Sequence, residues 1–263
     1  MRELSLEPIT IFDAAPPDLV SIAAAVGCQH VSLWVHPPVP GMDGPNLIGD
    51  AELRRETARR LADTGVQVLN IECFNLNEST DFDACKRSLE VGAALGGKCA
   101  TAIAFGNREL AGIPSQFARL AEIADGFGLR LNVEFISMGD IRTLEDAIAL
   151  TGGVPKAGVT VDLLHLYRTG ATPADLARLP DNLVGHIQIC DGPAVASDPI
   201  LEGATQRRIP GAGTFPVKAF AEAFAPSHHP LGLEVPLKDL QDQGISALER
   251  ARRVVEGLRR VLA

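Results

Sequence analysis

The sequence predicts a single (β/α)8 barrel, an α/β fold in which eight parallel strands alternate with eight helices. Short apolar runs alternate with amphipathic segments along all 263 residues, and eight units in this length suit a closed barrel. The first run is followed by residues 11–15 (IFDAA), which lack the glycine-rich turn typical of a doubly wound open sheet. We therefore expect one barrel domain over residues 1–263.

The apolar runs define the expected wall of the barrel. The strands are expected at Leu4–Thr10, His30–Val35, Val66–Phe74, Lys98–Phe105, Leu129–Phe135, Gly158–Leu163, Leu183–Cys190 and Pro230–Val235. Helical patterns lie near residues 17–26, 51–64, 82–95, 114–126, 142–151, 173–179, 216–225 and 244–262. Residues 191–215 show no clear periodicity, and such a long connection is usually functional or disordered.

Composition narrows the classes of function. The hydrophobic fraction of 46% is enough for a large core, and the net charge of −9 disfavours nucleic acid as a partner. No apolar run approaches membrane-spanning length, so no membrane partner is expected. The C-terminal helix carries five arginines, which we interpret as a solvated face: Arg250, Arg252, Arg253, Arg259 and Arg260.

The five cysteines indicate neither a disulfide framework nor a cysteine zinc site, because their number is odd and none forms a C-x-x-C pair. The N-terminus, Met1-Arg2-Glu3-Leu4, lacks the long apolar stretch of a signal peptide. A cytoplasmic location is the resulting expectation.

Each of the last four expected strands ends in a side chain that can bind a metal, namely Glu134, Asp162, Gln188 and Glu234. Each alternates with apolar neighbours, so it is expected to point into the barrel. Three buried carboxylates would raise one another's pKa values and lose hydration, and a divalent cation would offset both effects. An all-oxygen ligand set favours Mg²⁺ or Mn²⁺ over Zn²⁺.

These side chains lie within longer motifs. The motifs are Asn-Val-Glu134-Phe, Asp162-x-x-His165 with Gly170 beyond, His186-Ile-Gln188-Ile-Cys-Asp191, Arg207-x-x-Pro210-Gly211-x-Gly213 and Gly-Leu-Glu234-Val-Pro. Over essentially its whole length the chain resembles the xylose isomerase-like barrels, a superfamily of sugar isomerases, epimerases and their relatives. The resemblance implies one divalent metal at the strand ends, with Glu134 and Glu234 as acid and base.

The resemblance also implies substrate contacts. His165 is expected to reach a substrate oxygen beside the metal, and Arg207 another, although Arg208 is the alternative for that role. Trp34, the single tryptophan, could line a sugar pocket or only pack against neighbouring side chains. Many members have histidine where this chain has Gln188, whereas hydroxypyruvate isomerases and some dehydroshikimate dehydratases are similar to it in using glutamine.

Several other polar residues have competing interpretations. His186 has the strand parity of Gln188 but lies deeper, which favours a hydrogen-bonded core histidine over a ligand. Asp191 could orient a ligand or form a plain turn, and the glycines at 211 and 213 indicate a turn rather than a phosphate cradle. His36 and the inward-facing Glu72 remain secondary candidates.

The leading functional hypothesis is an isomerase or epimerase of a small polyhydroxy carbonyl compound, acting by proton transfer through an enediolate. The alternative is a dehydratase that expels a β-hydroxyl from a cyclic keto-polyol such as dehydroshikimate or inosose. A non-catalytic metal-binding protein and a relative of the abasic-site endonucleases are remote, the latter because few histidines approach the site. Related barrels often pair, so a homo-oligomer is also an expectation.

Overall fold

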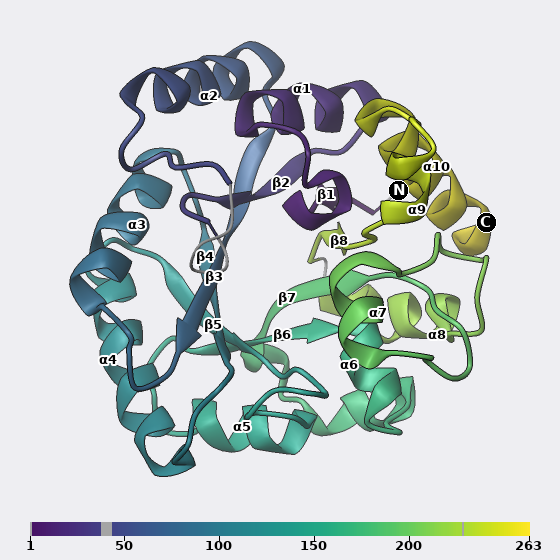
Figure 1. Ribbon diagram of the computed structural model, residues 1–263. Helices are drawn as coiled ribbons and strands as arrows, with labels where there is room; N and C mark the ends of the chain where they lie inside the picture. Colours follow the sequence, from purple (N-terminus) through teal and green to yellow (C-terminus); the bar gives the residue numbers. More distant parts are fainter. Residues whose placement is uncertain (1, 38–43, 228) are drawn as a thin grey trace.

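The protein forms a closed barrel of eight parallel strands, in the order β1 to β8, and this confirms the expected fold. We analysed a computed structural model, in which residues 2–37, 44–227 and 229–263 are described. Figure 1 shows the strands at the centre of the molecule and the helices around them. Within the described residues, no helix is both long and apolar enough to cross a membrane.

The element bounds follow the predicted alternation. The strands are β1 Leu4–Leu6, β2 His30–Trp34, β3 Gln67–Leu76, β4 Cys99–Ala104, β5 Arg130–Glu134, β6 Gly158–Asp162, β7 Val184–Ile189 and β8 Leu231–Leu233. The α-helices are α1 Pro16–Val26, α2 Ala51–Thr64, α3 Phe82–Ala94, α4 Ile113–Asp125, α5 Leu144–Thr151, α6 Leu163–Arg168, α7 Pro199–Thr205, α8 Val217–Ala223, α9 Lys238–Asp242 and α10 Ala247–Leu262. Short 3-10 helices occur at Pro8–Ile11, Leu110–Gly112, Pro173–Arg178, Asp181–Leu183 and Ala225–Ser227.

Several elements differ from their predicted form, and α6 and α9 lie where no helix was predicted. The first strand ends at Leu6 because a 3-10 turn begins at Pro8, whose ring nitrogen cannot donate to a strand ladder. The helix expected at 173–179 is a 3-10 helix. The aperiodic segment contains α7, whose first turn is capped by Asp198 Oδ1, at 2.9 Å from the Ile200 amide and 3.1 Å from that of Leu201.

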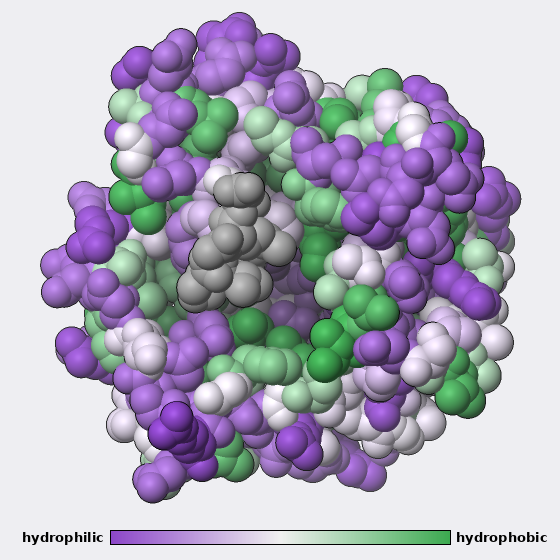
Figure 2. Space-filling model, in the orientation of Figure 1, coloured by the Kyte–Doolittle hydropathy of each residue, from purple (hydrophilic) through white to green (hydrophobic). Residues whose placement is uncertain are grey.

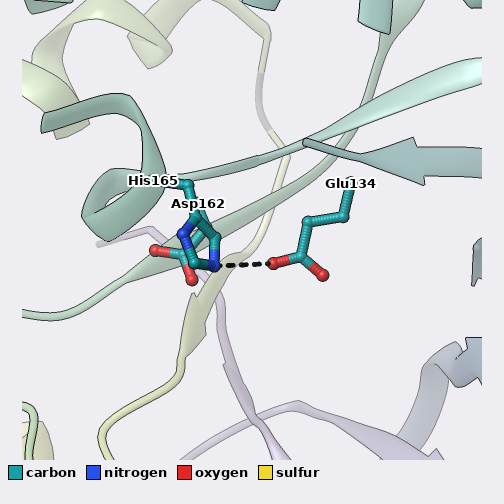
Figure 3. Close-up of side chains that lie close together, drawn as sticks. All are labelled: Glu134, Asp162 and His165. Atoms are coloured by element: carbon teal, nitrogen blue, oxygen red, sulfur yellow. Dashed lines mark ion pairs between the residues drawn. The ribbon is translucent and has the colours of Figure 1, made fainter. Parts of the chain in front are cut away.

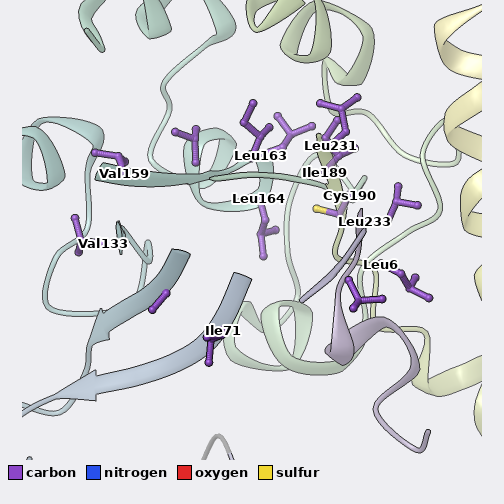
Figure 4. Packing of buried hydrophobic residues seen from close by; sticks show 14 of the residues in the cluster. Leu6, Ile71, Val133, Val159, Leu163, Leu164, Ile189, Cys190, Leu231 and Leu233 are labelled. Carbon is purple, nitrogen blue, oxygen red and sulfur yellow. The ribbon is translucent and has the colours of Figure 1, made fainter. Parts of the chain in front are cut away.

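The strands separate an apolar outer layer from a polar interior. Outward side chains such as Val133, Val159 and Ile189 are fully buried against the helices, in the cluster drawn in Figure 4. Inward positions of the lower barrel carry polar groups that are almost completely buried: Ser5, Ser32, Asn70, Thr101, Asn132, Thr160 and His186. Thr101 and Thr160 meet across the interior, with their hydroxyl oxygens 3.0 Å apart. The polar side chains at the carboxyl ends of the strands, which form the mouth of the barrel, therefore lie above a layer of buried polar groups.

The C-terminal helix is not the uniform solvated face that the sequence predicts. Arg250 is 2% exposed, donates to the Ile245 carbonyl oxygen at 2.6 Å and forms an ion pair with Asp13 after β1. Arg252 and Arg253 do lie at the surface, each paired with Glu249. The prediction was wrong for Arg250, because its burial depends on a partner more than 200 residues away. This contact joins the last helix to the first unit of the barrel.

Candidate metal centre

Asp162 and His165 are placed by the tight junction between β6 and α6. Asp162 ends the strand and also caps the helix, its Oδ1 accepting the Leu164 backbone N–H at 2.7 Å. Helix α6 begins at once with Leu163, so His165 falls in its first turn. The local sequence thus brings a carboxylate and an imidazole to the same point of the barrel mouth.

Glu134 at the end of β5 completes a compact three-residue group. Glu134, Asp162 and His165 each offer one ligand atom, and these atoms all lie within 4.8 Å of one another. Figure 3 shows the imidazole facing the Glu134 carboxylate, with His165 Nε2 and Glu134 Oε1 3.7 Å apart. All three side chains are buried, and the group could hold a divalent metal ion.

Gln188 and Glu234 lie beside this group on the neighbouring strands. Gln188 Nε2 donates to Glu234 Oε1 at 3.2 Å, and Glu234 itself follows β8 directly. The Gln188 Oε1 atom is buried and has no hydrogen-bond partner among the described residues. An amide oxygen without a hydrogen-bond partner beside carboxylates is a suitable ligand for a hard cation. The predicted set of metal ligands therefore fits a divalent metal.

Arg207 reaches the same place from the segment after α7. Its Nη1 donates to Asp162 Oδ2 at 2.5 Å, to Glu234 Oε2 at 2.7 Å and to the Glu234 carbonyl oxygen at 3.2 Å. Arg208 points elsewhere: its side chain is exposed, with Nη1 3.5 Å from the Ala212 carbonyl oxygen. The structure therefore brings Arg207, and not Arg208, into contact with the predicted ligands.

Burial and mutual repulsion control the protonation of the carboxylates. Burial, with the Asp162 charge added, raises the pKa of Glu134 to about 8, and burial raises that of Glu234 well above its usual range. Burial is the largest influence on Asp162 and acts in the same direction, but the charge of Arg207 together with hydrogen bonds that include the Leu164 backbone N–H outweighs it, so the pKa of that carboxyl is lowered. Asp162 therefore stays ionised beside Arg207 near neutral pH.

His165 is held as a neutral imidazole, because burial lowers its pKa to about 4. Its Nδ1 accepts the backbone N–H of Ser137 at 3.4 Å, which leaves the ring proton on Nε2. That nitrogen faces Glu134. His165 is thus oriented to donate a hydrogen bond at the mouth.

The other sequence candidates lie outside the metal-ligand group. Asp191 is buried and fastens the following loop, its two carboxylate oxygens accepting the backbone N–H groups of Gly211, Gly213 and Phe215 at 2.9–3.0 Å. A Cβ at position 213 would lie 2.2 Å from Asp191 Oδ1, so the glycine there serves this turn. Trp34 is half-buried at the end of β2, and His36 Nδ1 lies 3.0 Å from the Ser88 hydroxyl.

A second buried polar group lies deeper in the barrel, and one of its members, Glu7, was not predicted from the sequence. His186 Nε2 is 3.2 Å from Glu7 Oε2, which confirms His186 as a hydrogen-bonded core histidine. Asn70 Nδ2 donates to Glu72 Oε2 at 3.0 Å, and burial raises the pKa of Glu72 well above its usual range. The alternation of Ser5, Leu6 and Glu7 was the signal in the sequence that could have found Glu7.

The mouth of the barrel is a hollow partly rimmed by apolar side chains. Figure 2 shows the hollow at the centre, with hydrophobic residues beside it. Helix α7 contributes Ile200 and Leu201, which are 64% and 47% exposed.

Comparison with known proteins identifies the family of the chain. The family model described as xylose isomerase-like TIM barrel matches residues 20–261. The chain belongs to this family. Two curated relatives are 3-dehydroshikimate dehydratases, one from Pseudomonas aeruginosa (26% identical) and one from Pseudomonas putida (24%). Each match covers 98% of this chain but only 41% of the relative, so the chain spans less than half the length of these proteins.

Solved structures support the fold. One is a fusion of a xylose isomerase-like TIM barrel with a 4-hydroxyphenylpyruvate dioxygenase, with a TM-score of 0.80 and 20% identity. The match covers 98% of this chain and 42% of the fusion protein. The IolI protein, solved with a zinc atom, has a TM-score of 0.82 at 16% identity, covering 100% and 98%. A 3-keto-D-glucoside 4-epimerase from E. coli has a TM-score of 0.73 at 15% identity, covering 99% of each chain.

Proposed function

We propose that the protein is a divalent-metal-dependent dehydratase of a cyclic hydroxy-keto acid of the 3-dehydroshikimate type. The observation that carries this proposal is the unequal state of the two glutamates. Both oxygens of Glu234 accept hydrogen bonds, from Gln188 and from Arg207. Glu134 has only the looser contact with His165 among the described residues. One free carboxylate suits an elimination, which begins with the removal of a single proton.

Glu134, Asp162, Gln188 and Glu234 would hold the metal ion. The ion would supply Lewis-acid polarisation of the substrate carbonyl. Glu134 removes the proton from the carbon next to that carbonyl, because its carboxylate is engaged only by the looser contact with His165 among the described residues. His165, neutral and protonated on Nε2, donates a hydrogen bond to a substrate oxygen at the same face. The electron pair left on carbon then expels the β-hydroxyl, which takes up the proton held by Glu134 and leaves as water, and the product is conjugated.

The two curated relatives named as 3-dehydroshikimate dehydratases support the choice of substrate class. They share only part of their length with this chain, so their activity is carried over as a proposal. The second candidate is an isomerase or epimerase of a small sugar or hydroxy-carbonyl compound. In its favour, Glu234 follows a different strand from the one that carries Glu134, and it could return a proton once it is released from Arg207.

The test is an assay of 3-dehydroshikimate with metal-stripped protein and with protein reloaded with Mn²⁺ or Mg²⁺. The proposal predicts ultraviolet absorbance from an aromatic product only with the metal, and its loss in Glu134→Gln. A panel of ketoses and hydroxypyruvate in deuterated water forms the second arm. Deuterium entry into a ketose, with no absorbing product from 3-dehydroshikimate, would replace the dehydratase with the isomerase.

A further inference from the structure

Arg207 is a buried cation among buried acids. Its side chain is 4% exposed, and it makes close ion pairs with both Asp162 and Glu234. Its Nε also donates to the Gly203 carbonyl oxygen of α7, at 3.3 Å. The guanidinium is therefore fixed at both ends, by α7 and by two of the predicted metal ligands.

The remaining oxygens of these two carboxylates are also engaged. Asp162 Oδ1 accepts the Leu164 backbone N–H at 2.7 Å, and Glu234 Oε1 accepts the Gln188 amide at 3.2 Å. A second cation that binds both residues must therefore share their oxygens with bonds already present or replace them. The charge of Arg207 repels a divalent ion at this range, and low dielectric strengthens the repulsion.

We propose that Arg207 is a resident counter-cation, which holds the metal-free carboxylates together and lowers the affinity of the site for its metal. This inference rests on the metal-dependent function proposed above. Without an ion, the guanidinium supplies the charge that like carboxylates need to stay close. When an ion binds, the same charge opposes it.

Removal of the charge therefore has opposite effects on two quantities. The metal-free protein loses a counter-ion and becomes less stable, whereas the ion loses a repulsive neighbour and binds more tightly. A purely structural arginine would act differently, because a site damaged by its loss would bind the metal more weakly. Metal affinity is thus a readout that separates the two roles.

The experiment compares wild type, Arg207→Met and Arg208→Met after chelation and dialysis. Arg208→Met is the matched control, since it removes an exposed charge from the adjacent residue. Calorimetric titration with Mn²⁺ at pH 8.5 limits competition by protons for Glu134. We expect the Mn²⁺ dissociation constant of Arg207→Met to fall at least about tenfold, and that of the control to stay within about twofold of wild type.

Thermal unfolding of the same proteins gives the second readout. Without metal, Arg207→Met is expected to unfold at a lower temperature than the wild type. Saturating Mn²⁺ is expected to raise the melting temperature of the variant more than that of the wild type. Should this variant fail to fold, Arg207→Gln keeps a hydrogen-bond donor without the charge, and it too is expected to bind Mn²⁺ more tightly.

Unchanged or weaker Mn²⁺ binding by a folded variant would overturn this inference and leave the dehydratase proposal standing. If neither wild type nor variant binds Mn²⁺, Mg²⁺ or Zn²⁺, both proposals fall together.

Discussion

At the scale of single residues, the site depends on unequal surroundings for similar side chains. Glu134 and Glu234 have the same chemistry, and burial raises the pKa of both. Arg207 and Gln188 nevertheless bind the oxygens of Glu234, whereas Glu134 faces His165. Neighbours from a strand, a helix and a loop therefore give the two glutamates different surroundings.

His165 gives the prediction that belongs to this scale. Replacement with Phe removes the Nε2 hydrogen-bond donor while it keeps a ring of similar shape in the first turn of α6. We expect the proposed dehydratase turnover to fall by about 10²- to 10⁴-fold, the usual contribution of one positioned proton-transfer or hydrogen-bonding group. Steady-state kinetics at saturating Mn²⁺ check this, and the Mn²⁺ dissociation constant of the variant separates a loss of turnover from a loss of metal. A variant with wild-type kcat would remove His165 from the chemistry.

At the scale of elements, helix α7 is anchored by a buried ion pair. Arg168 at the end of α6 pairs with Glu202 of α7 through two nitrogens, and also donates to the Pro193 and Ala194 carbonyl oxygens. The Glu202 side chain is 5% exposed and that of Arg168 is 13% exposed. Because Arg207 Nε bonds to Gly203 of the same helix, this pair also helps to place Arg207.

Glu202→Gln tests the anchor. Loss of one partner leaves Arg168 without its counter-charge, and we expect a loss of about 3 kcal/mol in the free energy of unfolding, the lower end for buried pairs because Arg168 keeps some contact with water. Urea unfolding measures this loss, and hydrogen exchange should show faster opening of α7. The control is Glu145→Gln, which breaks an exposed pair with Arg178 and is expected to cost less than about 1 kcal/mol. Equal effects in the two variants would contradict the role of the anchor.

At the scale of the whole molecule, the buried acids link stability to pH. The Glu134 carboxyl ionises near 4.5 in the unfolded chain but near 8 in the folded, metal-free protein. The folded state therefore holds a proton that the unfolded chain has released, and the stability from this difference is lost as the pH rises towards 8. His165, with its lowered pKa of about 4, affects stability only below about pH 6.5, the usual pKa of histidine.

The resulting prediction concerns the window from pH 6.5 to 8. The melting temperature of the metal-free protein is expected to fall across this window, and Glu134→Gln is expected to flatten the fall. Saturating Mn²⁺ should raise the melting temperature most at pH 8, because the ion binds the ionised carboxylates. Differential scanning calorimetry with chelator or with Mn²⁺ measures both effects. A melting temperature that rises with pH in the metal-free protein would show that other groups dominate.

Much of the fold and of the site could be predicted from the sequence because their signals are local. Alternation of apolar and polar residues placed Glu134, Asp162 and Gln188 on inward faces, and parallel strands bring their ends to one mouth. The Asp162-x-x-His165 spacing likewise lies within a single strand–helix junction. Each of these features depends on a few consecutive residues.

Only the tertiary structure decided which side chains meet across the barrel. The choice of Arg207 over Arg208, the pairing of Glu7 with His186, and the burial of Arg250 against Asp13 all join distant parts of the chain. Helix α7 is too short to show a period in the sequence, and contacts with α6 hold it in place. Pattern along a chain sets the direction of a side chain, whereas its partner depends on how the eight units close into a ring.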